Sequence, residues 1–539
     1  MELTLFGDED GGAADSNAAL GAVKGGAIVE VVLETGRRFS ESLLWRVQRE
    51  YFERAGVAAW HVVPHYITCN PLLARSFAEV ILGFLGDAGD GGGEPFYVVE
   101  LGAGSGRFGY LLLEALRALH VHSADGHPPL RYVMTDFAET NLAFFSAHPR
   151  LRPFVAEGLL DFARLDVEDA GEIVLRESGV TLRPGSCKNP IVVIANYVFD
   201  GVPHDAFSFR DGDVHDALAT VLADDAEPDL TGSAPFAALR ARFDPHPAPA
   251  APYPEPIFNE IVRDYARDLD GATLLFPSAA LRAVDRLAAL ADGRMLLVSS
   301  DKGYADVRSF ASRGDPELVV HGSFSVEVNY HAFRLWFERR GGRALVSEPG
   351  QGGLCVGAFL LGISERRARD TTVAYHRVFG PGDGRDFFRV RRGIQEHYDV
   401  LDVETLLALV RSSGHDPRVL GDCLPSLVRQ RALLANAPLR AEALAAIDRV
   451  WHHHYDIGEP ADLAFGIGAL LYAIDAPEEA LRYFEASLAA RGDDSRTLWN
   501  MALCALALRR HGDAATLLAR ALAAQPPLAG LTGLLWKDG

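Results

Sequence analysis

The sequence predicts an α/β domain built on a mostly parallel sheet that ends in an antiparallel hairpin, followed by an all-α C-terminal domain. Short apolar runs alternate with helical patterns as far as residue 362, and strand patterns are absent after it. Apolar runs between helices are typical of parallel strands buried on both faces of a sheet. These runs are "FYVVEL", "RYVMTD", "PIVVIANYVFD" and "RMLLVSSD". In "ALVSEPGQGGLCVGAFLLG" two strand-like pieces flank a Pro/Gly turn, which predicts the hairpin.

The composition excludes several classes of protein. The formal net charge is -21, and because such a chain repels a phosphate backbone we expect no nucleic-acid partner. The five cysteines are scattered without metal-ligand spacing, which predicts a reducing, cytoplasmic location and no metal site. No apolar run approaches ~20 residues, and the N-terminal residues lack an apolar signal segment, so we expect no membrane association.

The pattern along the chain predicts five parts. They are a poorly ordered N-terminus rich in Gly, Ala and Asp (1–27), a helical segment that packs on the α/β domain (28–95), the α/β domain (96–362), a helical linker region (363–460) and a domain of helical repeats (461–539). Within the second part, "SESLLWRVQREYFERAG" has the periodicity of an amphipathic helix, with Ser40 or Ser42 as its cap.

An insertion is predicted inside the α/β domain. About 100 residues separate Asn196 from the strand "RMLLVSS", which is far more than one crossover needs. The intervening sequence holds the Pro-rich "DPHPAPAAPYPEP" followed by helical patterns. We interpret residues from about 205 to 290 as an insertion that covers a site.

The C-terminal part contains a repeat. Large and small apolar residues recur with an offset of 34, which is the period and size pattern of tetratricopeptide repeats. The pairs are Phe465 and Trp499, Tyr472 and Leu506, Ala480 and Ala514, and Phe484 and Leu518. Two repeats are clear, and the alternative is an ordinary helical bundle.

A glycine-rich turn follows the strand "FYVVEL". Read from Gly104 to Gly109 it matches G-x-G-x-x-G, the dinucleotide fingerprint, although that match alone is weak. Read from the strand end, Glu100, Gly102, Gly104 and Gly106 give E-x-G-x-G-x-G. This register resembles the S-adenosylmethionine loop of class I methyltransferases. The glutamate can accept from the amine of the methionine part, and glycine N–H groups can donate to its carboxylate.

Two further acids follow the next two strands. Asp136 ends "RYVMTD", where a carboxylate can accept from a ribose diol, and Asp166 follows "LLDFARL", where it can accept from the adenine amine. Each acid alone is equally typical of a solvated turn or a helix cap. Three acids in this order after three strands indicate S-adenosylmethionine as the cofactor.

Several segments resemble one family. "NPIVVIANYVFDGVPHDAF" is similar to the "ANEFFDALPVHQF" segment of the MidA-like methyltransferases, which include the mitochondrial complex I assembly arginine methyltransferase. "PHYITCNPLLARSFAEVILGFL", "LLVSSDKGYAD" and "GSFSVEVNYHAF" resemble its "GDFITAPEISPLFGELLA", "LLIDYGYP" and "DITAHVNFTAL". The resemblance covers about residues 40–365 in the same order and implies a class I methyltransferase fold with a Rossmann-like sheet. The repeats lie outside it.

The resemblance assigns the cofactor site residue by residue. It implies that the following residues lie beside the cofactor or hold it: Thr68, Asn70, Pro71, Glu100, Gly102, Gly104, Gly106, Asp136, Asp166 and Asn196.

The same segment supplies the catalytic candidates. Asp200 is the predicted proton acceptor, and Asn196 or Tyr197 positions the methyl acceptor. Tyr197 stands where the family has glutamate, which puts arginine specificity in question. His204 replaces an apolar residue of the family and is either a base or a surface or capping histidine. Pro203 also matches the segment, and the aromatic residues Tyr66 and Tyr330 either line the pocket or belong to the core.

Three functions are consistent with these features. The first is a methyltransferase acting on a protein or peptide side chain, including an arginine-type nitrogen, with the repeats recruiting the polypeptide. The second is a small-molecule methyltransferase of a natural-product pathway, with the repeats forming a homodimer. The third is a non-catalytic assembly factor that keeps the fold.

Overall fold

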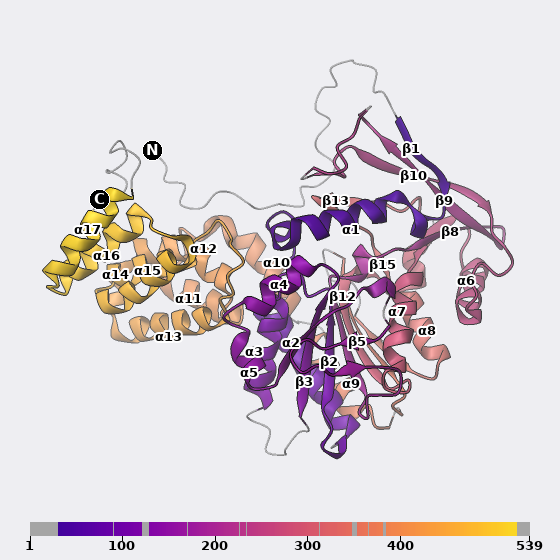
Figure 1. Ribbon diagram of the computed structural model, residues 1–539, viewed down its shortest axis with the longest axis horizontal. Coiled ribbons are helices and arrows are strands. Elements are labelled where there is room, and N and C mark those ends of the chain that lie inside the picture. The colour runs from indigo at the N-terminus through magenta and orange to yellow at the C-terminus, as the bar shows by residue number, and fades with distance from the viewer. Residues whose placement is uncertain are drawn as a thin grey trace. The chain divides into compact units, whose positions relative to one another are not determined.

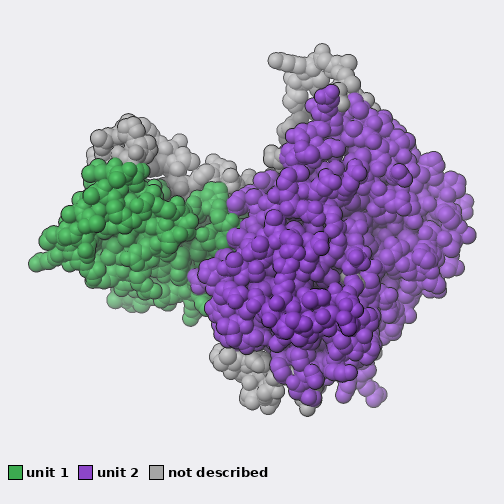
Figure 2. All heavy atoms as spheres, in the orientation of Figure 1, with its two compact units in different colours: residues 1–9, 386–539 green, residues 10–385 purple. Residues whose placement is uncertain are grey.

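The computed structural model describes residues 31–89, 91–120, 129–169, 171–225, 227–232, 234–311, 313–347, 353–364, 366–380 and 384–524. The predicted poorly ordered segment 1–27 and residues 525–539 of the predicted repeat domain lie outside these ranges. The described residues divide into two compact units, 31–385 and 386–524, which Figure 2 colours separately. Each unit has a hydrophobic core of its own.

A seven-strand sheet with a short additional strand forms the centre of the first unit (Figure 1). Its strands are β2 (Phe96–Leu101), β3 (Leu130–Asp136), β4 (Leu160–Arg164), β7 (Ile191–Asn196), β12 (Met295–Tyr304), β16 (Arg343–Val346) and β17 (Leu354–Leu361), and β15 (Val328–Asn329) extends it beside β12. The order is β16-β17-β12-β7-β2-β3-β4. All neighbours from β12 to β4 are parallel, whereas β17 is antiparallel to both β12 and β16. The predicted mostly parallel sheet with a terminal antiparallel hairpin is therefore confirmed.

Helices cover both faces of this sheet, which explains the nearly continuous apolar runs of its strands. Helices α7 (Ser278–Ala289) and α8 (Tyr330–Arg339) pack on one face. Helices α2 (Pro71–Ala88), α3 (Arg107–His120) and α9 (Arg369–Val378) pack together on the other side. Successive strand residues point to opposite faces, so both layers bury apolar side chains.

The order in which the chain adds strands to the sheet changes side between β2 and β7, although these two strands are parallel. The strands β3 and β4 continue from β2 to one side, and β7 and β12 lie on the other side. In open parallel sheets such a switch point leaves a crevice at the carboxyl ends of the two central strands, where ligands bind. The residues that end β2 and β7, Leu101 and Asn196, therefore mark the expected site.

A second sheet, entirely antiparallel, lies within the same unit. It consists of β1 (Val31–Arg37), β8 (Asp205–Arg210), β9 (Asp213–Ala223), β10 (Leu239–Pro247) and β11 (Ala272–Phe276). Strand β10 pairs with one edge of β9, and β8 and β1 share the other edge. The sequence analysis missed these strands, because it expected helix in segment 28–95 and helical patterns after the Pro-rich stretch in 205–290.

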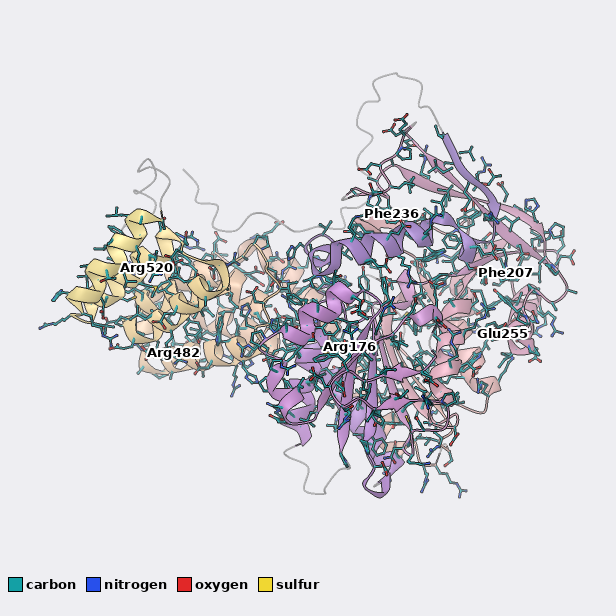
Figure 3. The ribbon with its side chains drawn as sticks, in the orientation of Figure 1. Arg176, Phe207, Phe236, Glu255, Arg482 and Arg520 are labelled. Carbon is teal, nitrogen blue, oxygen red and sulfur yellow. The ribbon has the colours of Figure 1, made fainter. Side chains whose placement is uncertain are left out.

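The second sheet connects two hydrophobic clusters. Phe207 of β8 packs in the core of the main sheet, whereas Phe236 belongs to a cluster with Phe39, Trp45 and Phe324 (both labelled phenylalanines are drawn in Figure 3). The alternation of Leu239, Ala241 and Phe243 with arginines in β10 is the period-two signal of a half-buried strand.

The remaining elements of this unit are short or lie at its edges. They are α1 (Leu43–Ala55), α4 (Glu139–Ala147), α5 (Arg152–Ala156), α6 (Pro256–Asp268), β5 (Ile173–Val174), β6 (Thr181–Leu182), β13 (Val319–His321), β14 (Ser323–Ser325) and the 3-10 turns η1 (Phe39–Glu41), η2 (Gly56–His61), η3 (Gly91–Gly93), η4 (Val167–Asp169), η5 (Phe199–Gly201) and η6 (Val307–Phe310). Helix α1 confirms the predicted amphipathic helix, and Ser42 is its cap.

The described part of the second unit is helical. Its elements are α10 (Gly384–Ile394, which begins in the first unit), α11 (Val403–Ser412), α12 (Pro417–Arg429), α13 (Ala437–His453), α14 (Leu463–Ala473), α15 (Pro477–Arg491), α16 (Ser495–Ala507) and α17 (His511–Ala523), with the 3-10 turns η7 (Gln395–His397) and η8 (Arg431–Ala435). The offset of 34 relates α14 to α16 and α15 to α17, and Ala480 and Ala514 are both buried. Their assignment as tetratricopeptide repeats remains a prediction. Within the described ranges no helix is long and apolar enough to cross a bilayer.

The first unit extends beyond residue 362. Helix α9 packs on α2, and Asp87 at the end of α2 accepts hydrogen bonds from Thr371 N (2.8 Å) and Thr371 Oγ1 (2.6 Å). The buried Tyr375 donates to the carbonyl of Val356 in β17 at 2.7 Å. Helix α9 therefore completes the layer on this side of the sheet.

We expect a chain that ends at residue 385 to unfold cooperatively, and a chain that ends at residue 363 to be less stable by about 3–5 kcal/mol. The shorter chain loses the buried Tyr375 and leaves the apolar face of α2 exposed. Urea unfolding followed by circular dichroism measures the difference. Equal midpoints for the two chains would show that α9 contributes nothing to this fold.

Candidate active site

A pocket lies at the switch point, beside the carboxyl ends of β2, β3, β4 and β7. Six residues of the sequence-based site line it: Gly102, Asp136, Asp166, Tyr197, Asp200 and Pro203. The lining also includes residues that the sequence analysis did not single out, which are Trp45, Gln48, Arg49, Phe52, Trp60, Val63, Phe137, Asn141, Leu165, Val167, Glu168, Val198, Gly201, Val202, Ser323, Phe324 and Ser325.

The glycine turn contributes Gly102 to the lining of this pocket, whereas Gly104 is not part of that lining. Gly102 and Gly104 have φ values of 55° and 58°, a left-handed conformation that costs glycine little. A Cβ atom on Gly104 would lie 2.5 Å from Cζ2 of Trp60, so the position also requires the absence of a side chain. Gly106 (φ 79°) donates its N–H to the carbonyl of Ala103 at 2.8 Å and leads into α3. Gly106 does not line the pocket.

Asp136 fixes the turn from the end of β3. One carboxylate oxygen, Oδ2, accepts from Gly104 N (2.9 Å) and from Asn141 Nδ2 (3.2 Å), and Oδ1 accepts from Ala138 N (2.9 Å). The residue is 2% exposed, and this burial raises its pKa to about 6 in spite of the N–H donors. Asp136 therefore ties the glycine turn to the end of β3 and to α4 (Glu139–Ala147).

Trp60 of η2 lies against the glycine turn with an unused donor. Its ring packs against Phe52 of α1 at a centroid distance of 5.9 Å. The indole Nε1 is buried and has no hydrogen-bond partner among the described residues. Buried donors are nearly always paired, so this N–H is an exception within the described part of the fold.

Asp166 is held by Arg49, a residue that the sequence analysis missed. Arg49 Nη2 lies 2.5 Å from Asp166 Oδ2, and the guanidinium carbon lies 5.1 Å from the ring centre of Phe137. The hydrogen bond to Asp166 is the largest cause that raises the pKa of Arg49. Arg49 and Phe137 therefore cover the side of the pocket where Asp136 and Asp166 meet.

Glu100 does not line the pocket. It is 2% exposed and points from β2 toward α3, because its Oε2 lies 2.5 Å from where a Cβ on Gly109 would be. Burial is the main cause that raises its pKa to about 8, and Tyr132 lies beside it. The structure therefore places this carboxyl group under helix α3, away from the cofactor position predicted for it.

Thr68, Asn70 and Pro71 also lie outside the pocket lining. Asn70 caps α2 by accepting from Leu73 N at 3.0 Å, and its amide donates to the carbonyls of Tyr66 (3.2 Å) and Ile67 (2.9 Å). Pro71 begins the helix, which suits its missing N–H. The polar groups of Asn70 are thus used within the fold.

Asn196 joins three segments at the end of β7. Its Nδ2 donates to the carbonyl of Thr68 at 2.7 Å, and its Oδ1 accepts from Ser300 Oγ at 2.5 Å. Both ends of the amide are occupied, so Asn196 positions the loop before α2 against β7 and β12. It does not line the pocket.

Tyr197 follows with an unusual backbone. Its φ of 59° is uncommon for a bulky residue and costs roughly 1–3 kcal/mol. Its N–H donates to the carbonyl of Ser300 at 2.8 Å, and its side chain packs beside the cluster of Tyr51, Ala59 and Val63. Burial raises its pKa, and the charges of Asp200 and Asp301 raise it further, so the phenol stays neutral.

Asp200 forms a pair with Asp301, which the sequence analysis overlooked. Asp200 lies in η5 and is 3% exposed, whereas Asp301 lies in β12 and is fully buried. Their carboxyl groups interact with each other. Burial is the largest cause that raises the pKa of both groups, and it raises the pKa of Asp200 to about 7. An acid at the end of the apolar strand "RMLLVSSD" was the available signal.

His204 lies in the core. It is 0% exposed, its Nε2 donates to the carbonyl of Phe199 at 2.8 Å, and burial lowers its pKa to about 4. Tyr330 is also buried, with its hydroxyl beside Asp301 and Ser299. Neither residue lines the pocket, and Tyr66 does not line it either.

Four aromatic residues of the pocket lining and Asp200 form a group that we call the acceptor end. Its members are Trp45, Phe52, Tyr197, Asp200 and Phe324. The rings of Trp45 and Phe324 pack at a tilt, with a centroid distance of 4.8 Å and an interplanar angle of 52°, and both residues belong to the cluster under the second sheet. Gln48 of α1 donates to the carbonyl of Gly201 (3.2 Å) and accepts from Phe324 N (3.0 Å). Helix α1 and β14 are thereby fixed above η5.

Comparisons with known proteins give few matches. No family model matches the sequence, and no curated protein does. The chain is similar to the solved structure of an uncharacterized COG1565 superfamily protein from Burkholderia thailandensis, with a TM-score of 0.39 and 16% identity over 65% of this chain and 91% of that chain. It is also similar to a COG1565 superfamily member from Burkholderia thailandensis bound to S-adenosyl-homocysteine, with a TM-score of 0.39 and 16% identity over 61% of this chain and 89% of that chain.

We expect Glu100→Gln to flatten the pH dependence of stability. The folded-state pKa of Glu100 is raised to about 8, so its contribution to stability is complete below its unfolded pKa and is lost as pH rises through about 8. Relative to the parent chain, the variant should gain roughly 2–4 kcal/mol between about pH 5 and pH 9. Urea unfolding across this range measures it.

The same change at the exposed Glu41 is the control. Parallel stability curves for the Glu100 variant and the parent chain would mean that the Glu100 carboxyl group is ionised in the folded protein.

Proposed function

We propose that this chain is an S-adenosylmethionine-dependent methyltransferase. The observation that carries the proposal is one pocket at the switch point that joins the glycine turn, Asp136 at the end of β3 and Asp200 after β7. When bound, S-adenosylmethionine supplies a methyl group on a sulfonium, and its transfer needs mainly an aligned nucleophile and the exclusion of water.

The strand order supports this cofactor over a dinucleotide. Dinucleotide-binding folds have six parallel strands in the order 3-2-1-4-5-6. Here an antiparallel strand, β17, lies between β12 and β16, as in the Rossmann-like sheet of class I methyltransferases that the sequence resembles. The G-x-G-x-x-G match beginning at Gly104 is therefore secondary to the register that begins at the strand end.

The residues of the pocket fit this cofactor. Asp136 would hold the ribose, because it ends β3 and lines the pocket, and a carboxylate can accept from both hydroxyl groups of a diol. Phe137 offers an aromatic face for the adenine, beside Asp166. The unpaired N–H of Trp60 and the exposed backbone of Gly102 would hold the methionine part.

The acceptor end suits a nitrogen nucleophile. A protonated amine or a guanidinium is attracted by aromatic faces such as those of Trp45 and Phe52, and it needs a group that takes a proton. Asp200 lines the pocket, has a pKa raised to about 7 and has no other donor on Oδ2. Asp200 would therefore accept the proton, and Tyr197 would contact the acceptor beside it.

A protein or peptide is the proposed acceptor. Large apolar side chains are exposed next to the pocket: Val62 is 58% exposed, and Val320 is 40% exposed in the hairpin whose Gly322 approaches Val62. Contiguous exposed apolar surface marks sites that bind other proteins, and these two valines would contribute to such a surface. The helical repeats would recruit this substrate. There are two alternatives. The protein would be a small-molecule methyltransferase whose repeats form a homodimer, or it would be a non-catalytic assembly factor.

We expect the purified chain to bind S-adenosylmethionine and S-adenosyl-homocysteine and to bind NAD poorly in isothermal titration calorimetry. Asp136→Ala should weaken cofactor binding about 30- to 1000-fold, because a charged contact worth roughly 2–4 kcal/mol is lost. NAD binding without S-adenosylmethionine binding would refute the proposal.

The matched control is Asp161→Asn in β4. Asp161 is equally buried, but its carboxylate accepts from Phe162 N, Glu177 N and Ser178 Oγ, away from the pocket. This variant should keep the parent affinity. Equal losses in both variants would mean that Asp136 acts only through the stability of the fold.

Removal of residues 386–539 should raise the KM for a protein acceptor at least tenfold and leave cofactor affinity unchanged, because the repeats would bind the polypeptide outside the pocket. The acceptor is first identified by labelling a lysate with S-adenosylmethionine, and steady-state kinetics then compare both chains. Unchanged KM on a protein acceptor would exclude the recruiting role, and label found only in small molecules would favour the second alternative.

A further inference from the structure

Two carboxyl groups meet beneath the acceptor end, and the fold brings them there from different elements. Asp301 follows Ser300 in β12, which pairs in parallel with Asn196 at the end of β7. Asp200 lies four residues further along, in η5, where its carbonyl accepts from Val326 N at 3.0 Å. The sheet register and this turn therefore fix the distance between the two side chains.

The contact between these groups requires a proton. Two ionised carboxylates have no donor between them, so a hydrogen bond from one to the other exists only when one is protonated. Asp200 Oδ2 and Asp301 Oδ1 are both buried and have no other partner among the described residues. The second oxygen of Asp301, Oδ2, is beside two hydroxyl groups, at 3.2 Å from Tyr330 and 3.4 Å from Ser299.

We propose that Asp301 is a positioning residue that shares one proton with Asp200 and thereby holds the Asp200 carboxylate toward the acceptor. The assignment of Asp200 as proton acceptor rests on the proposed function, whereas the sharing of the proton rests on the burial of both carboxyl groups, on their oxygens without a hydrogen-bond partner and on the register that brings β7 and β12 together. The two members have different access, since Asp200 lines the pocket and Asp301 does not.

The groups around the pair oppose the loss of its last proton. The groups that face it are Tyr197 after β7, Lys302 on β12, and Tyr330 of α8, with Cys355 of β17 behind Tyr330. Burial raises the pKa of Asp200 to about 7 against the opposing effect of Lys302. Burial and then the charge of Asp200 raise the pKa of Asp301 well above its usual range. Asp301 is thus the member that keeps the proton.

This pair takes up the proton that the acceptor nitrogen releases in the reaction. The nitrogen of the acceptor gives its proton to Asp200, so the pair then holds two protons and is neutral. The nitrogen lone pair forms the new N–C bond as the S–C bond breaks, and the electron pair of that bond stays on sulfur. Asp200 afterwards releases its proton to water through the pocket that it lines, and Asp301 keeps the other.

Infrared spectroscopy of the free protein, labelled with carboxyl-¹³C aspartate, tests the shared proton without cofactor or acceptor. At about pH 8 an ordinary aspartate is ionised, so the carbonyl band of a protonated aspartic acid reports the pair. We expect this band in the parent chain, its loss in Asp301→Asn and its retention in Asp161→Asn. No band in the parent chain, or a band that persists in Asp301→Asn, would overturn the proposal.

Kinetics test the positioning role. Asp301→Asn keeps a donor toward Asp200 and should stay within about threefold of the parent kcat, with the acid limb of its pH profile in place. Asp301→Leu has no donor, so its kcat should fall about 10- to 100-fold with little change in KM, and its acid limb should move to higher pH. Equal behaviour of the two variants would show that Asp301 is merely structural.

The two experiments separate the inference from the function on which it rests. A protein that shows the band but binds no S-adenosylmethionine keeps the proton-sharing pair and loses the methyltransferase. A protein that binds S-adenosylmethionine without the band keeps the proposed function and loses the role of Asp301. If Asp301→Leu fails to fold, the spectra of the parent chain and of Asp301→Asn still decide the shared proton.

Discussion

The hydrogen bond from Gly104 N to Asp136 is the interaction on which the rest of the pocket depends. It joins the turn after β2 to the end of β3 at 2.9 Å, and the same carboxylate oxygen also binds Asn141 of α4. Because the turn is fixed, Trp60 can pack directly on Gly104, and Phe52 packs against the ring of Trp60. The position of Trp60 thus depends on one backbone N–H and one carboxylate.

The buried acids near this interaction differ in the number of hydrogen-bond donors that their carboxyl oxygens receive. Asp136 has donors on both oxygens, so a charged form is stabilised there in spite of burial. Glu100 and the pair of Asp200 and Asp301 have oxygens without a donor, and in each case burial raises the pKa. Unpaired buried carboxyl groups reduce stability. Asp200 lies in the pocket lining, where perturbed pKa values are common at functional sites, whereas Glu100 lies outside it.

The sequence predicted those features that depend on local patterns. Apolar runs and glycines located the main sheet, the hairpin of β16 and β17, the glycine turn and Asp136. The second sheet was missed because its strands are half-buried and lie near prolines such as Pro245 and Pro247 in β10. The sequence analysis missed Arg49 and Asp301 because each acts through a partner 100 or more residues away in the sequence. It missed Trp60 because the role of that residue comes from its burial, and a single residue carries no periodic signal. Conversely, Asn70 and Asn196 were predicted to lie beside the cofactor, but their amides bond within the fold, that of Asn70 with the backbone and that of Asn196 with the carbonyl of Thr68 and the hydroxyl of Ser300.

The identity of residue 197 bears on the charge of the acceptor. In the family that the sequence resembles, a glutamate stands at this position, where it would place a third carboxyl group beside Asp200 and Asp301. With Tyr197 the phenol stays neutral, and the pair supplies a single negative charge to the acceptor end. A guanidinium is bound best by a carboxylate that can take both of its N–H groups side by side, whereas one charge among aromatic faces suits a compact ammonium. Under the proposed function, the tyrosine that puts arginine specificity in question would therefore suit an amine nitrogen as the acceptor.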